Sequence, residues 1–103
     1  MDQPVYSFGY IQVKDHADYM ERYGQHIPAI IAKFGGEFLA ATQNNALVEG
    51  NAPGNWVVLA RFPSKEQARA FMTSEEYAPF LKLRQDELTD SNLVISFFDE
   101  LPA

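Results

Sequence analysis

Three segments of the chain are apolar at successive positions, which predicts strands without a solvent-facing side. In residues 5–13, one side carries two small residues, Ser7 and Gly9, and the other carries three aromatic residues. Residues 56–62 (WVVLARF) and 93–98 (LVISFF) are also largely apolar on both alternating sides. A half-exposed antiparallel strand alternates apolar and polar residues, and these segments do not. We therefore expect both faces of the sheet to be covered.

Two other regions have the spacing of amphipathic helices. The first follows Asp15, whose carboxylate suits an N-cap, and its apolar residues recur as far as Phe34. Pro28 lies inside this region, so we expect a kink about one turn before it. The second region occupies residues 64–88, with serines placed to cap helices at its start and at residue 74.

Residues 37–43 are expected to form a further strand, and residues 46–50 a short additional one; the alternative is one strand broken by a bulge. The order is then β-α-β-β-(β)-α-α-β within a single domain of residues 1–103. This order predicts an α+β, ferredoxin-like split βαβ fold, an antiparallel sheet with its helices on one face. Two helical regions can cover only one face of such a sheet. The simplest cover for the second face is another copy of the chain, so we expect a homodimer.

Charge and composition exclude several classes of partner. The net charge is -6 at pH 7, and the eight lysines and arginines are scattered, which argues against nucleic acid and anionic membranes as partners. The chain has no cysteine, and its two histidines lack a metal-binding spacing, so no metal site is expected. The start of the chain resembles no signal peptide and no apolar run is long enough to span a membrane, which predicts a cytoplasmic protein.

Arg84 and Glu49 are candidate catalytic residues. Arg84 shares a helical stripe with Tyr77 and Leu88, so its guanidinium is expected to point inward or along the sheet edge, where it could bind a carboxylate or enolate oxygen. The more common role for such an arginine is a structural salt bridge, or an apolar stem with its head in water. Glu49 could pair with Arg84 or act as a general base. The more common alternative is a strand-end carboxylate in solvent.

His26 is the third catalytic candidate, and three tyrosines are candidates for ligand binding. His26 follows Tyr23 by one turn on the expected inner stripe, where it could act as a base or a haem ligand. A lone histidine there is more often a boundary residue with a satisfied hydrogen bond. Tyr19, Tyr23 and Tyr77, together with Arg84, could line a cavity. The alternative is that the tyrosines belong to the core.

A set of spaced residues resembles the family called domain of unknown function 1330. The set is Gly35-Gly36 with Phe38-Leu39, Glu49-Gly50, Phe62-Pro63-Ser64, Ser74-x-x-Tyr77 and Arg84. The resemblance extends from Tyr10 to Phe97. It implies a dimeric α+β barrel, in which two ferredoxin-like sheets close face to face. Relatives in that superfamily include small monooxygenases, haem-degrading enzymes and muconolactone isomerase-like enzymes. Glu75 departs from the family pattern, which has proline there.

Three hypotheses for function follow from these residues and the resemblance. The first is a small-molecule-binding domain, or a cofactor-independent enzyme of isomerase or monooxygenase type, acting on a small, partly aromatic substrate between sheet and helices. The second is a non-catalytic structural or stress-associated dimer whose cavity is filled by its own side chains. The third is haem binding, for which His26 is the candidate axial ligand. A shared fold is weak evidence for a shared function. We expect no cofactor.

Overall fold

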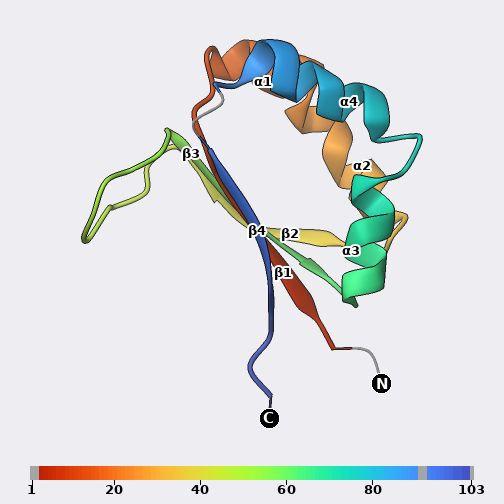
Figure 1. The fold of residues 1–103 in the computed structure, drawn as a ribbon. Helices are drawn as coiled ribbons and strands as arrows, with labels where there is room; N and C mark the ends of the chain where they lie inside the picture. Colours follow the sequence, from red (N-terminus) through yellow and green to blue (C-terminus); the bar gives the residue numbers. More distant parts are fainter. Residues whose placement is uncertain (1–2, 91–92, 103) are drawn as a thin grey trace.

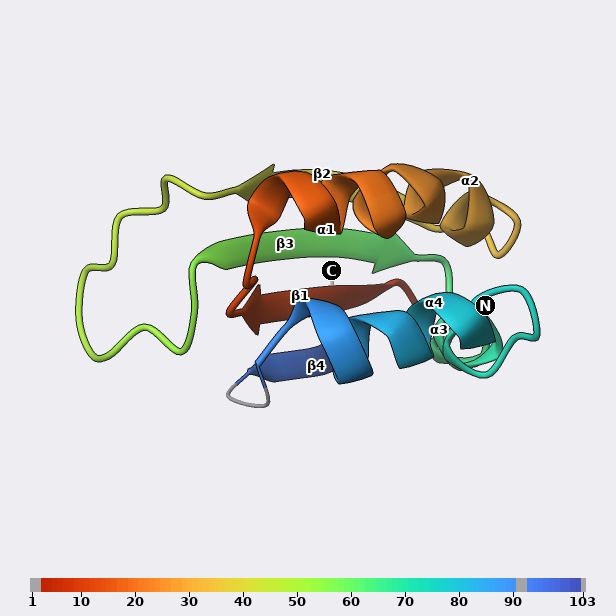
Figure 2. The same ribbon diagram turned by 90° about the horizontal axis from the view of Figure 1, so that it is seen from above.

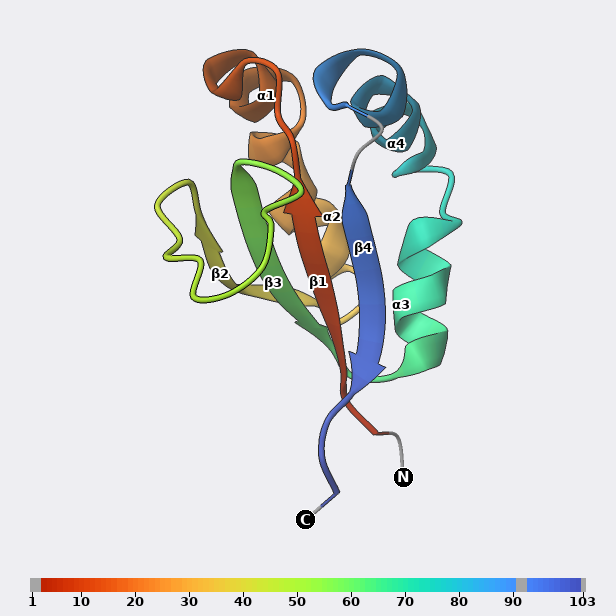
Figure 3. The same cartoon turned by 60° about the vertical axis from the view of Figure 1, so that its left-hand side comes forward.

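The computed structural model describes residues 3–90 and 93–102, which form one antiparallel sheet with its helices on one face (Figure 1). The strands are β1 (Val5–Ile11), β2 (Glu37–Thr42), β3 (Trp56–Phe62) and β4 (Val94–Asp99). They lie in the order β2-β3-β1-β4, which is the ferredoxin-like order, so the predicted α+β fold class is confirmed. Figure 3 shows β1 flanked by β3 and β4.

The helical segments fall into two groups, one after β1 and one after β3. They are α1 (His16–Arg22), the 3-10 turn η1 (Gly24–His26), α2 (Ile27–Ala32), α3 (Lys65–Met72), α4 (Ala78–Leu83) and the π-helical turn η2 (Arg84–Leu88). Figure 2 shows the first group over β2 and β3 and the second group over β4. The turn η1 interrupts the first group at the predicted kink, because the ring of Pro28 cannot join a continuous helix.

The predicted caps position the helices. Asp15 Oδ1 accepts a hydrogen bond of 3.0 Å from the backbone N–H of Asp18, and Ser64 Oγ accepts one of 3.1 Å from the N–H of Gln67. Each bond satisfies an amide that has no partner within the helix. Gly35 follows α2 with a φ of 76°, a conformation that ends helices and favours glycine.

The register of the strands separates two sets of side chains. On the helix side, β1 places Val5, Ser7, Gly9 and Ile11 opposite Phe62, Ala60, Val58 and Trp56 of β3. The core lies between this side and the helices. The opposite side, here called the uncovered face, carries Tyr6, Phe8, Tyr10, Val57, Leu59, Val94 and Phe98.

No helix covers the uncovered face within the described chain, and its apolar side chains meet solvent (Figure 1). Val94 and Phe98 are 47% and 48% exposed. Tyr6 and Arg61 both contact Glu100 at one end of this face, the first through a 2.7 Å hydrogen bond and the second through a 3.8 Å ion pair. A single chain therefore leaves a contiguous apolar surface open, with polar groups at its rim.

The prediction of a short strand at residues 46–50 is wrong. These residues belong to a loop of residues 43–55 that joins β2 to β3 and projects on the side of the sheet away from the helices (Figure 1). Val48 is 90% exposed. A strand needs a neighbouring strand to receive its backbone hydrogen bonds, and the described chain offers none at this place. The short apolar run resembles a strand in sequence, but no neighbouring strand is present among the described residues to pair with it.

In residues 3–90 and 93–102, no helix is long and apolar enough to cross a membrane.

Candidate functional site

An apolar pocket of about 290 Å³ lies between the sheet and the helices; we call it the inner pocket. Its floor includes the small residues Ser7 and Gly9 of β1 and Ala60 of β3. A Cβ atom added to Gly9 would meet no atom within 4 Å. The pocket therefore exists because β1 places small side chains where larger ones would fill the space. Its volume is at the lower end of the range of about 300–1,000 Å³ for ligand sites, which suits a small ligand.

Aromatic side chains form much of the wall. Trp56 and Phe62 contribute from β3, Phe71 from α3, and Tyr19 and Tyr23 from the first helical group. The rings of Tyr19 and Tyr23 pack with centroids 5.0 Å apart. Such a wall favours flat, apolar ligands, because aromatic rings pack in offset or edge-to-face contacts.

The tyrosine hydroxyls supply polar groups at the pocket. The oxygens of Tyr23 and Tyr77 lie 2.5 Å apart in a buried hydrogen bond in which either hydroxyl can donate. Burial has the largest effect on Tyr23 and raises its pKa well above the ordinary value. The neighbouring Tyr77 and Tyr19 oxygens raise this pKa further. Burial also raises the pKa of Tyr19, although the nearby Arg84 cation opposes the change. Both groups are therefore neutral hydroxyls at physiological pH.

Arg84 is the one charged residue among the described residues that line the inner pocket. It is 3% exposed, and its Nε and Nη1 atoms are buried without a hydrogen-bond partner. Burial by itself would lower the pKa of Arg84, but the Tyr23 and Tyr77 oxygens outweigh that effect and raise it. The guanidinium therefore keeps its charge. The predicted inward direction of the side chain is confirmed.

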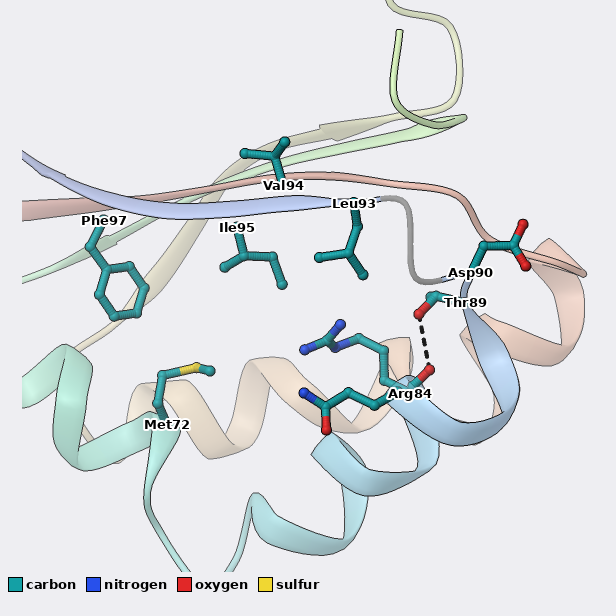
Figure 4. Close-up of a pocket in the computed structure, with 9 residues that line it drawn as sticks. Met72, Arg84, Thr89, Asp90, Leu93, Val94, Ile95 and Phe97 are labelled. Carbon is teal, nitrogen blue, oxygen red and sulfur yellow. Dashed lines mark hydrogen bonds between the residues drawn. The ribbon is translucent and has the colours of Figure 1, made fainter.

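The π-helical turn η2 positions Arg84. The backbone N–H and the Oγ1 hydroxyl of Thr89 both donate to the carbonyl oxygen of Arg84, at 3.1 Å and 3.0 Å. Figure 4 shows the second of these bonds and the guanidinium extending below Leu93 and Ile95. A π-turn holds one more residue than an α-turn, and such turns are frequent at functional sites.

A second hollow of about 790 Å³, the edge cleft, lies beside β4 and η2 (Figure 4). Arg84, Met72 and Ile95 line both the edge cleft and the inner pocket. Arg84 therefore lies where the two hollows adjoin. Ile95 is 38% exposed although its side chain faces the helices, so the inner pocket is not sealed at the β4 edge.

Glu49 and His26 do not join Arg84. Glu49 is exposed in the loop of residues 43–55 and lines neither hollow. The expectation that His26 lies on the inner stripe is wrong, because the 3-10 turn η1 rotates it out to the exposed surface. There its Nε2 atom is 3.1 Å from the carbonyl oxygen of Glu21, and its ring stacks on Phe80. Neither histidine contributes to the described lining of the two hollows.

The sequence matches the family described as Domain of unknown function (DUF1330) over residues 4–97. The chain belongs to the DUF1330 family. A comparison with the curated proteins finds no match.

Solved structures with the same fold have low sequence identity to this DUF1330 chain. RPA0582, a protein of unknown function from Rhodopseudomonas palustris, has a TM-score of 0.77 at 16% identity, over 100% of this chain and 86% of that one. SnoaB, a cofactor-independent oxygenase from Streptomyces nogalater, has a TM-score of 0.68 at 16% identity, over 98% and 96%. A dimeric, ferredoxin-like protein of unknown function from Bacteroides fragilis has a TM-score of 0.59 at 14% identity, over 94% and 96%. The TM-scores show a common fold.

Several pocket residues of this DUF1330 domain were not candidates from the sequence. Gly9 and Ser7 form part of the floor, and Trp56 forms part of the wall. The available signal was the pair of small residues that interrupts a run of large ones in β1. Whether such a pair leaves a cavity depends on what the helices place above it, and the sequence of the strand does not contain that information.

Among the residues that the structure describes, no three histidine, cysteine, aspartate or glutamate side chains gather as metal ligands.

Proposed function

We propose that this DUF1330 domain binds a small, partly aromatic molecule in the inner pocket. The observation that carries the proposal is the space above Gly9, which no side chain of the described protein fills. A structural module whose cavity is filled by its own side chains would place atoms there. The aromatic wall and the few polar groups at Arg84 and the tyrosines have the composition of ligand sites, which are mostly apolar with a few oriented polar groups.

Binding is the activity that the geometry supports best, and catalysis is a further step of the proposal. The fold shared with SnoaB is an analogy that supports a cofactor-independent reaction of isomerase or monooxygenase type. Such a reaction begins with removal of a proton from the substrate. No carboxylate or imidazole is among the described residues of the inner pocket, so the base would have to come from outside that lining. The exposed position of His26 also gives haem binding no support from the pocket.

We further propose that the domain is a homodimer formed through the uncovered face. Val94, Phe98 and their neighbours present a contiguous apolar surface, and apolar patches of this kind mark sites of association. The polar contacts of Glu100 with Tyr6 and Arg61 lie at the rim, as polar groups do in protein interfaces. The dimeric Bacteroides fragilis protein with the same fold supports this choice of partner.

Native mass spectrometry of the purified protein, followed by ligand-observed NMR, tests both proposals. We expect a dimer, and we expect members of a panel of single-ring aromatic compounds to bind at the inner pocket. The panel contains benzoate, benzamide, trans-cinnamate and trans-cinnamamide. The matched control is Gly9→Val, which fills the floor. A panel that gives no signal, or signals that Gly9→Val leaves unchanged, would contradict ligand binding in the inner pocket. A monomer at micromolar concentration would contradict the dimer.

A further inference from the structure

The guanidinium of Arg84 has no carboxylate partner among the described residues, and two of its three nitrogen atoms have no hydrogen-bond partner. The residue is 3% exposed, and neither Nε nor Nη1 has a hydrogen-bond partner, although the guanidinium interacts with the Tyr77 hydroxyl. Removing a charged group from water costs free energy unless an opposite charge or hydrogen bonds replace the water. The fold therefore keeps a positive charge at the inner pocket that is only partly hydrogen-bonded and that no negative charge of the described chain neutralises.

No acidic side chain of the described chain supplies the missing charge. The basic residues in ion pairs are Arg22, Lys33, Arg61 and Lys82, and each meets its carboxylate at the surface. The described lining of the inner pocket contains no aspartate or glutamate. Asp90 lines the edge cleft, but it is exposed and forms no ion pair with Arg84. The counter-charge is therefore expected to come from a ligand.

The hydroxyl groups of Tyr23 and Tyr77 provide a further hydrogen-bond donor near Arg84. Two hydroxyl groups carry two hydrogens, and the bond between Tyr23 and Tyr77 uses one of them. The second remains to be donated. A cation together with a spare hydroxyl hydrogen favours an anionic oxygen over a neutral group, because hydrogen bonds between charged partners are the stronger ones.

We propose that the inner pocket selects aromatic carboxylates, with the carboxylate bound to Arg84 and the ring placed above Gly9 between the aromatic walls. This inference rests on the proposed function and specifies the class of ligand. The net charge of -6 repels anions at long range, so the selectivity comes from this one internal cation. Since Arg84 is buried, the preference for the anion is expected to be largely insensitive to salt up to about 0.15 M.

Calorimetric titration with two matched pairs, benzoate with benzamide and trans-cinnamate with trans-cinnamamide, tests the selectivity. The wild-type protein is expected to bind each carboxylate at least about tenfold more tightly than its amide. Arg84→Met should remove the difference between acid and amide, and Arg84→Lys should retain part of it. Arg69→Met is the matched control, because Arg69 is exposed on α3 away from the inner pocket lining, and it should leave the difference unchanged.

Thermal unfolding without ligand gives a second and independent readout. Arg84→Met removes a buried charge that has no counter-charge among the described residues and has two nitrogen atoms without partners, so its melting temperature is expected to equal or exceed that of the wild type. Carboxylates should raise the melting temperature of the wild type and fail to raise that of Arg84→Met. A lower melting temperature for Arg84→Met would show that Arg84 is a structural residue and would overturn the inference.

The outcomes separate this inference from the proposed function. Equal binding of acids and amides, abolished by Gly9→Val, would overturn the role of Arg84 and leave the pocket as a ligand site. A carboxylate preference that survives in Arg84→Met would also overturn that role. Failure of all four compounds to bind would contradict the proposed function itself.

Discussion

The hydroxyl oxygens of Tyr23 and Tyr77 lie 2.5 Å apart, although 54 residues separate the two in the sequence. Tyr23 follows α1 and Tyr77 precedes α4, so this buried bond joins the two helical groups directly above the sheet. It fixes the separation of the groups, and the inner pocket lies between them and the strands.

Removing either hydroxyl is expected to destabilise the protein by about 1–2 kcal/mol, because the remaining hydroxyl loses its buried partner. Denaturant unfolding of Tyr23→Phe, Tyr77→Phe and the double variant measures this cost. The double variant should cost less than the sum of the two singles. Tyr10→Phe is the control, since its hydroxyl accepts a bond from Asn45 at an exposed site. Additive effects of the two buried substitutions would contradict a direct coupling.

Stability is expected to fall at alkaline pH. In the folded protein burial raises the pKa of Tyr19 and of Tyr23, and Arg84 offsets this only in part, so both stay protonated when the unfolded chain begins to ionise near pH 10. Above that pH the unfolded state binds fewer protons than the folded state. The free energy of unfolding should therefore decrease, by up to about 1.4 kcal/mol per pH unit for each tyrosine.

Urea unfolding between pH 8 and pH 11 checks this slope. Absorbance at the tyrosinate wavelength should show that these two residues ionise only as the protein unfolds. A Tyr19→Phe variant should have a shallower slope above pH 10. The same slope in that variant and in the wild type would show that Tyr19 titrates normally in the folded protein.

Gly9→Val is expected to fill the floor of the inner pocket without disturbing the sheet. The position has no atoms within 4 Å of a new Cβ, and valine is favoured in strands, so the free energy of unfolding should rise by up to about 1 kcal/mol. Ligand binding should weaken at least about tenfold, which corresponds to about 1.4 kcal/mol. The control is Ala70→Val on the exposed surface of α3. Loss of stability in Gly9→Val would indicate that the floor is already occupied.

A charge introduced at Leu59 tests whether the uncovered face forms the dimer interface. Leu59 lies opposite Phe8 in the middle of this face. In Leu59→Asp, the new carboxylate of each monomer is in contact with solvent. A dimer formed through the uncovered face would bury the carboxylates of both chains, which costs free energy. The dimer dissociation constant should rise at least about 100-fold, or about 2.7 kcal/mol, as measured by sedimentation. Ala70→Asp makes a charge change on an exposed helix and should leave the dimer intact. An unchanged dimer in Leu59→Asp would place the interface elsewhere.

The helix caps and the four strands of the sheet followed from local chemistry, and the structure confirms them to within a few residues at their ends. Asp15 and Ser64 cap helices because their side chains reach amides three residues away, a relationship wholly contained in the sequence. The inward direction of Arg84 followed from the helical repeat it shares with Tyr77 and Leu88. These predictions needed no knowledge of the rest of the chain.

The misplaced residues depended on contacts between distant segments or on a change of helical geometry. A constant helical repeat would put His26 on the inner stripe, but the 3-10 turn η1 breaks that repeat just before Pro28. Residues 46–50 have the apolar run of a strand, but such a local run cannot reveal whether a neighbouring strand exists to pair with it. The empty space above Gly9 likewise depends on the sheet and the helices together, so the cavity could not be predicted from β1 alone.

The central position of β1 in the sheet also determines at which stage of synthesis the inner pocket can form. Val5–Ile11 is made first, but its two neighbours are β3 (Trp56–Phe62) and β4 (Val94–Asp99). Contacts so far apart in the chain close slowly, because the entropy of the intervening segment must be lost before the pairing forms. During synthesis, the first strand has to wait for the last before the sheet beneath the pocket is complete. A ribosome-bound chain stalled before β4 would therefore have Gly9 and Arg84 but no assembled pocket in which they meet.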